Sequence, residues 1–206
     1  MLRSIHRLVA VIAVLLMTVG VSPAAHAAVT ITFWSQEFGS NFPHAFFTVS
    51  GTPNAGGAPV DASYGFTAKA VTPAILMGTV PGRIDRPTPG YIDNSNAHFS
   101  TVLTDVQYAQ VLKLVDEWGE QGDHRYNLNR RNCVHFVAEA ARRSGLIVVE
   151  EKRLMKKPRS FTQSIAQMNA GRVAGIELPA KKYYASLATP PAIQAGTASA
   201  TLAPVR

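Results

Sequence analysis

The sequence of 206 residues has a single cysteine, Cys133. One cysteine excludes an intramolecular disulfide, so its thiol is a buried inert group, an intermolecular link or a reactive group. The sequence also has no GxSxG elbow, no phosphate-binding glycine loop and no HExxH, and its histidines and cysteine lack zinc-ligand spacing. We therefore expect neither a metal nor a cofactor.

No apolar run reaches the roughly 20 residues needed for a comfortable bilayer span. The nearest is Leu8–Val21, with 14 residues. It follows Arg3 and Arg7 and precedes Ala25-His26-Ala27, which fits a small-x-small cleavage site. This pattern predicts a signal peptide over 1–27 and export to the periplasm or the extracellular space; an uncleaved anchor is the alternative. We do not expect an integral membrane protein.

A strong excess of charge is also missing. The net charge is +7, and it falls to +5 without Arg3 and Arg7. No aromatic-basic platform accompanies it, so we expect no nucleic-acid binding. The one basic cluster, 150–160, is either a dock for an anionic envelope polymer or membrane, or a solvated connector between helices, which we favour.

What is present indicates one domain over 28–177 and an Ala/Pro-rich, disordered tail over 178–206. Apolar alternation and turn signals predict strands over 29–35, 42–51, 60–68, 74–80, 83–86 and 98–104. Helical spacing predicts helices over 104–119, 133–144 and 160–168, the first and last with capping boxes at Thr104/Gln107 and Ser160/Gln163. The order predicts an α+β fold with a small antiparallel sheet packed on helices.

The cysteine lies at a predicted helix start. Asn132 is a favoured N-cap residue, which places Cys133 at the first helical position. The helix dipole and the preceding Arg130 and Arg131 should lower the pKa of this thiol. The alternative is a packing role, because Cys133 shares an apolar stripe with Val137, Ala140 and Ala141.

A thiol nucleophile needs a base, usually histidine. His135, two residues after the cysteine, points away from it on a helix, and His124 lies in a polar loop. His44 begins the apolar strand HAFFTV and is the favoured base, with His98 in reserve.

The stretch NCVHFVAEAARRSGL, together with the upstream PHAFFTVSG, resembles the permuted branch of the NlpC/P60 papain-like thiol superfamily, which includes the lecithin retinol acyltransferase-like proteins. Those relatives carry an Asn-Cys-x-His-Phe-Val box at a helix start, and their catalytic histidine comes earlier in the chain, on a strand. The resemblance covers about residues 40–147 in outline. It implies a circularly permuted papain-like arrangement.

The resemblance also implies roles for particular residues. Cys133 would attack a carbonyl, His44 would transfer the proton, and Asp61 on the next strand would orient the imidazole; Ser63 or His98 are the replacements for Asp61. The backbone N–H of Cys133 would stabilise the oxyanion. Tyr126 would wall the substrate pocket, or else close the core as a loop aromatic.

We therefore expect an exported, monomeric cysteine hydrolase of the amidase or peptidase type, acting on a peptide or acyl-containing substrate of the cell envelope. Lipid deacylation or acyl transfer is the second enzymatic expectation, although the sequence shows no clear acyl groove. A non-catalytic envelope protein of the same fold is the alternative from another class.

Overall fold

The computed structural model describes residues 28–37 and 42–188. The strands are β1 (Val29–Gln36), β2 (His44–Gly51), β3 (Val60–Ala68), β4 (Thr79–Asp85), β5 (Asn96–Leu103), β6 (Arg125–Asn127) and β7 (Ala174–Pro179). The helices are α2 (Ala74–Met77), α3 (Pro89–Ile92), α4 (Asp105–Trp118), α5 (Cys133–Arg143), α6 (Pro158–Met168) and α7 (Ala180–Ala188). The signal peptide predicted over 1–27 lies outside the described residues.

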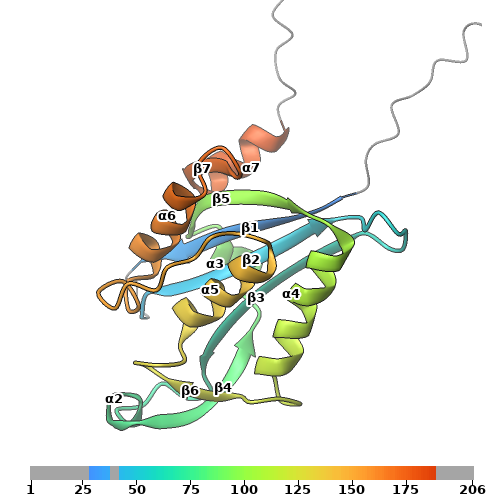
Figure 1. Ribbon diagram of the computed structural model, residues 1–206. Helices are drawn as coiled ribbons and strands as arrows, with labels where there is room; N and C mark the ends of the chain where they lie inside the picture. The colour runs from blue at the N-terminus through green and yellow to red at the C-terminus, as the bar shows by residue number, and fades with distance from the viewer. Residues whose placement is uncertain (1–27, 38–41, 189–206) are drawn as a thin grey trace, which may run out of the picture.

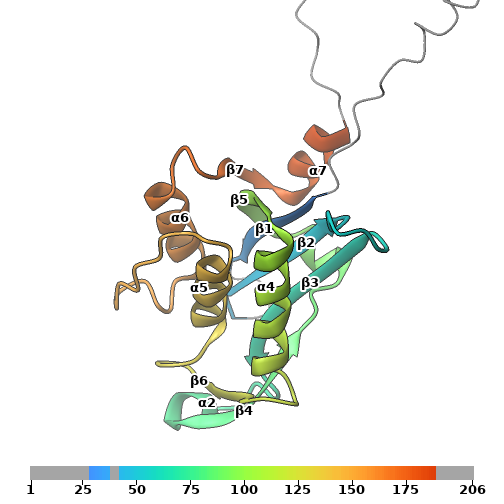
Figure 2. The ribbon, with the colours of Figure 1, turned by 45° about the vertical axis from the view of Figure 1, so that its right-hand side comes forward.

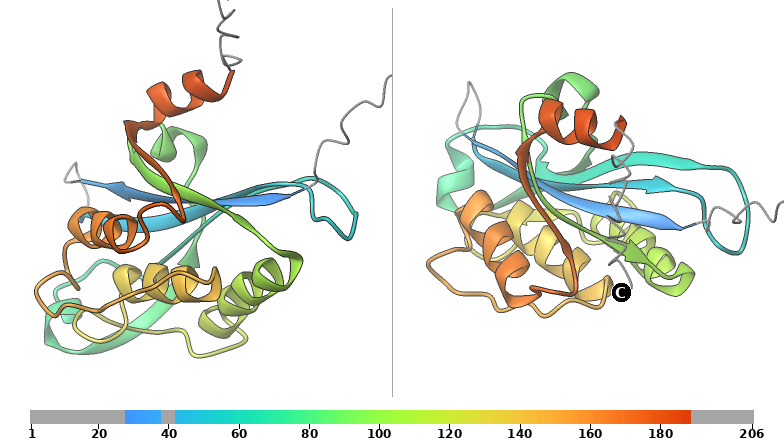
Figure 3. Two further views of the ribbon diagram at one scale, coloured as in Figure 1. Left: turned by 45° about the horizontal axis from the view of Figure 1, so that its top comes forward. Right: turned by 90° about the horizontal axis from the view of Figure 1, so that it is seen from above.

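The strands form one seven-stranded sheet in the order β6-β4-β3-β2-β1-β5-β7, and every pairing is antiparallel. The predicted α+β class with an antiparallel sheet is thus confirmed. Helices α4, α5 and α6 cover one face of the sheet, and the short α3 and α7 lie on the other (Figure 3). Figure 2 shows α4 and α5 in front of the sheet, with β4 and β6 extending toward α2 at the lower end.

The main core lies between the sheet and α4, α5 and α6. Alternate residues of β2 and β3 point to this side, and Phe47 packs on Phe136 of α5 with ring centroids 5.5 Å apart. Because side chains alternate along a strand, the intervening residues face the other side. There, Phe46 stacks on Trp34 at 6.1 Å in a smaller core beneath α3 and α7.

One of the two predicted capping boxes is present, and the other predicted helix start is displaced. Thr104 and Gln107 form the expected capping box on α4, with side chain and backbone bonded in both directions. The predicted start of the third helix at Ser160 is wrong, because α6 already begins at Pro158. Proline at the first helical position suits its fixed φ and missing N–H, so the helix needs no cap at Ser160.

Two segments differ from expectation near the site. The predicted strand over 74–80 is instead α2 followed by β4, which runs without a break to Asp85. The prediction failed because Ala74 to Met77 are four consecutive apolar residues, and such a run has no periodicity that distinguishes a strand from a helical turn. The turn at Pro89–Ile92, α3, was not predicted at all.

The predicted tail boundary at 178 is also wrong. Residues 174–188 form β7 and α7, and β7 pairs with β5 at the sheet edge. Tyr183 of α7 packs edge-on against Trp34 at 5.6 Å, so burial against the sheet outweighs the Ala-rich composition. Residues 189–206 of the predicted tail lie outside the described residues. Among the helices that the structure does describe, none is both long and apolar enough to span a bilayer.

Candidate functional site

Asn132 fixes the start of α5, as predicted. Its side-chain oxygen accepts hydrogen bonds from the backbone N–H groups of Val134 (2.8 Å) and His135 (3.2 Å). Its amide nitrogen donates to the carbonyls of Leu128 and Met155, both at 2.8 Å. One buried side chain therefore caps the helix and ties it to the loop before it and to the basic connector after it.

Cys133 occupies the first position of α5 and is 8% exposed. Burial raises the pKa of its thiol to about 11, although backbone hydrogen bonding from Ala45, Val134 and Cys133 itself opposes the rise. The expectation of a lowered pKa is therefore wrong for this resting structure. The free-energy cost of removing the thiolate from water exceeds the stabilisation that the N–H groups at the helix start give it.

The two arginines before the cysteine do not help the thiolate. Arg131 lies over the Trp118 ring, with its guanidinium carbon 3.5 Å from the ring centroid, and Arg130 is exposed. Neither arginine contributes to the pKa of Cys133.

His44 begins β2 and is also 8% exposed. Its Nε2 lies 3.7 Å from Oδ2 of Asp85 on β4, too far for a hydrogen bond, and this buried nitrogen has no other partner. Burial lowers the pKa of His44 to about 4, and the carboxylate of Asp85 raises it by a smaller amount. At neutral pH the imidazole is uncharged, so the contact with Asp85 is no salt bridge.

Gly65 on β3 makes room for this imidazole. Gly65 pairs with Phe46 and with Asp85, and a Cβ built on it would lie 2.5 Å from Nε2 of His44. Any larger residue would push the ring out of place. Tyr91 of α3 adds an edge-on ring contact to His44 at 6.3 Å.

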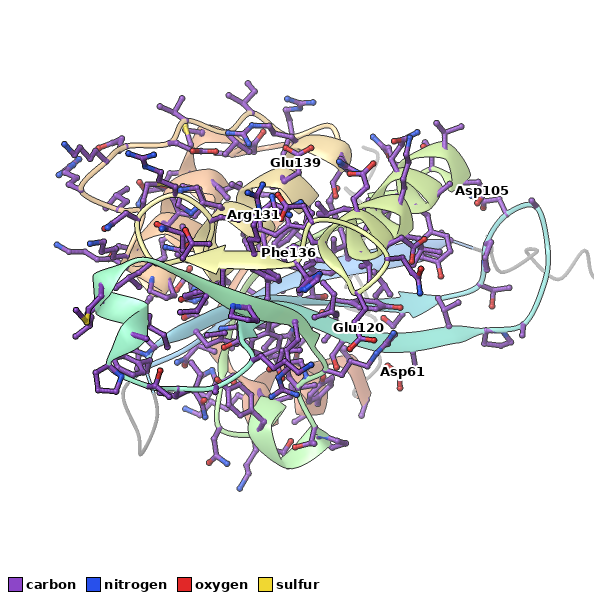
Figure 4. The ribbon with its side chains drawn as sticks, turned by 90° about the horizontal axis from the view of Figure 1, so that it is seen from below. Asp61, Asp105, Glu120, Arg131, Phe136 and Glu139 are labelled. Atoms are coloured by element: carbon purple, nitrogen blue, oxygen red, sulfur yellow. The ribbon has the colours of Figure 1, made fainter. Side chains whose placement is uncertain are left out.

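The structure separates Asp61 from His44, so the expectation that Asp61 orients the imidazole is wrong. Asp61 is exposed and pairs with Ser50, at the hairpin end of β2, whereas His44 begins that strand. Six residues of strand at about 3.3 Å each put the two far apart. Figure 4 shows Asp61 near the hairpin end, on the opposite side of the picture from α2. The replacement Ser63 donates to the carbonyl of Pro87 (2.8 Å) instead.

The other histidines have structural partners. His98 is fully buried between β1 and β7, with Nε2 2.8 Å from Oγ of Ser35 and Nδ1 2.9 Å from Oε1 of Glu177. These three residues do not line the cleft described below, so His98 serves neither as base nor as orienter there. His135 completes a capping box with Asn132, which the sequence did not predict, and His124 lies in an exposed loop, as expected.

Cys133 and His44 line one cleft of about 930 Å³, together with Asp85, Tyr91 and Tyr126. Tyr126 on β6 is 9% exposed, and it both lines this cleft and belongs to the main core, so its position fits both of its expected roles. Burial is also the main cause that raises the pKa of both tyrosines, and the nearby Cys133 adds to it. The cleft thus gathers a thiol, an imidazole, a carboxylate and two un-ionised phenols.

Within the residues that the structure describes, no group of three or more His, Cys, Asp or Glu side chains is arranged to hold a metal ion. No family model, curated protein or solved structure matches the chain. The residues of the cleft alone carry the functional argument.

Sequence reasoning missed Asp85, Tyr91 and Gly65. A signal for Gly65 was present, because an isolated glycine inside the strand pattern VDASYGFTA indicates a close approach of other atoms. Asp85 lies two strands from His44 in the sheet order, with β3 between them, and nothing in the local sequence indicates that placement.

Proposed function

We propose that the chain is an exported cysteine hydrolase of the amidase or peptidase type, with Cys133 as nucleophile and His44 as base. The observation that supports it is that Cys133, at a helix start, and the uncharged imidazole of His44 line one cleft. The arrangement is compatible with the permuted NlpC/P60 resemblance. Asp85 takes the orienting role in place of Asp61.

The reaction starts from a neutral thiol and a neutral imidazole, since burial disfavours both charged forms. The sulfur of Cys133 attacks the carbonyl carbon while its proton passes to His44. Nδ1 receives this proton, because Nε2 is turned toward Asp85. The imidazolium then gains the attraction of the Asp85 carboxylate, and a small movement closes 3.7 Å to a hydrogen bond.

The negative oxygen of the tetrahedral intermediate is stabilised by the N–H of Cys133. The cap side chain already occupies the next two N–H groups, those of Val134 and His135. Collapse of the intermediate expels the amine, which takes the proton from His44. Water then attacks the thioester and gives its proton to His44; release of the acid returns that proton to the sulfur.

A second candidate is hydrolysis of an acyl ester or thioester. The apolar walls of the cleft favour it, since Phe42, Val71, Ile75, Leu76 and Leu128 all line the space beside the polar groups. The sequence alone showed no such groove. An acyl chain is a substrate of matching chemistry, whereas a polar peptide would leave these walls without a complementary group.

The test is to incubate the protein starting at residue 28 with peptidoglycan fragments and, separately, with phospholipid vesicles, and to compare the products. Cleavage of amide bonds that is lost in Cys133→Ala supports the proposal. Release of fatty acid that is lost in Cys133→Ala assigns the second candidate. Equal product from both proteins would show that Cys133 is not the nucleophile, and no product with either substrate would count against both enzymatic candidates.

A further inference from the structure

The edge of the cleft carries exposed apolar side chains. Leu76 and Met77 of α2 are 71% and 89% exposed, and the nearby Val71 is 68% exposed. Leu76 and Val71 line the cleft, as does Phe42, which is 63% exposed. Single exposed apolar residues are ordinary, but several gathered at one cleft mouth indicate an interaction surface. We call these four residues the apolar rim.

The part of the rim that lies on α2, Leu76 and Met77, is held on a fixed support. Ile75 of α2 is buried in the main core, and α2 is followed directly by β4. Figure 1 shows α2 at the lower end of the molecule, beyond the edge of the helical layer, and no other helix or strand of the described residues covers its outer side. The neighbours of Ile75 in the helix, Leu76 and Met77, therefore project outward.

The charge around the rim is positive. No acidic residue occurs from 62 to 84, whereas Lys69 and Arg83 fall in this segment. Lys156, from the basic connector, lines the cleft as well. Asp85 is the acid of the cleft wall, and it lies beside Arg83 (3.6 Å) and His44 rather than out at the rim.

We propose that the apolar rim and its lysines dock this protein on an anionic phospholipid surface. Leu76 and Met77 would enter the boundary between head groups and acyl chains, while Lys69 and Lys156 would approach the phosphates. A second copy of the chain is the poorer partner, because joining two such rims brings like charges together. The proposal does not rest on the proposed catalysis.

The test is sedimentation of the protein starting at residue 28 with vesicles of phosphatidylglycerol and phosphatidylcholine in equal parts, and with phosphatidylcholine alone. We expect binding to the anionic vesicles that falls with added salt. Leu76→Ser with Met77→Ser should weaken it more than tenfold. Lys69→Gln with Lys156→Gln should weaken it by about fivefold for each charge removed.

Matched controls come from other faces of the fold. Val102→Ser with Val106→Ser removes two apolar side chains that are 61% and 72% exposed, on β5 and α4. Lys181→Gln with Lys182→Gln removes two charges from α7. Both should leave binding unchanged.

Equal loss in the controls, no binding by the unaltered protein, or equal binding to neutral vesicles would overturn the proposal. A dimer in light scattering that dissociates in Leu76→Ser/Met77→Ser would overturn it too, and would assign the rim to self-association.

Discussion

The thiol of Cys133 should titrate near pH 11 in the folded protein, because burial outweighs the helix start. A free thiol has a pKa of about 8.5, so at pH 7.5 about one in ten is ionised, against about one in three thousand at a pKa near 11. Ionisation alone should then slow alkylation by about 300-fold. His44→Gln should leave this pKa nearly unchanged, because a neutral imidazole adds no charge.

The assay is the rate of iodoacetamide alkylation from pH 6 to 11.5, followed by intact mass. Cys133 is the single cysteine, so the adducts that are missing from Cys133→Ala treated in parallel report on its thiol. The midpoint of the profile gives the pKa independently of steric access, which lowers all rates alike. The same chain in urea provides the reference midpoint.

The raised pKa also has a consequence for stability. The unfolded chain loses the thiol proton first as the pH rises, so stability falls between about pH 8.5 and 11, by ~3 kcal/mol in total. The difference in unfolding free energy between the protein and Cys133→Ala isolates this contribution. A folded-state midpoint below 8.5, or a midpoint that rises in His44→Gln, would refute the reasoning and indicate a preformed thiolate–imidazolium pair.

Three further predictions follow from the same site. Protonation of buried His44 should destabilise the fold as the pH falls from 6.5 toward 4, because the unfolded chain binds the proton first. The free energy of unfolding, measured with urea, should fall by about 3 kcal/mol over this range, and by less in His44→Gln. Gly65→Ala should abolish hydrolysis by displacing His44, whereas Gly175→Ala, with no atom within 4 Å of the added Cβ, should not. Asn132→Ala should lower the free energy of unfolding by about 2–4 kcal/mol, because it removes a helix cap and leaves two carbonyls unpaired. Thr104→Ala, which removes only a cap, should lower it by about 1 kcal/mol.

The sequence allowed much of the site to be predicted where the signal is local. The cap residue, the helix it starts and the inward stripe of Cys133, Val137, Ala140 and Ala141 follow from spacing alone, and all four stripe residues are buried. The strands β2 and β3 were likewise predicted from alternation and turn residues.

The errors concern properties that depend on long-range placement. Asp61 was assigned from its position on the next strand, but antiparallel register places it at the far end from His44 and lets β4 supply the carboxylate. The thiol pKa was predicted from the helix start without the depth of burial, which only the packed structure reveals. Burial then reverses the direction of the shift.

The most direct test of the Cys133–His44 pair is the rate at which Cys133 is acylated by a p-nitrophenyl ester, followed by nitrophenolate release and by the mass of the thioester. General base catalysis contributes about 10²–10⁴-fold to such a step. We expect His44→Gln to slow acylation by that order, while His124→Gln, in an exposed loop, leaves it unchanged. Acylation at the same rate in His44→Gln as in the unaltered protein would contradict the account.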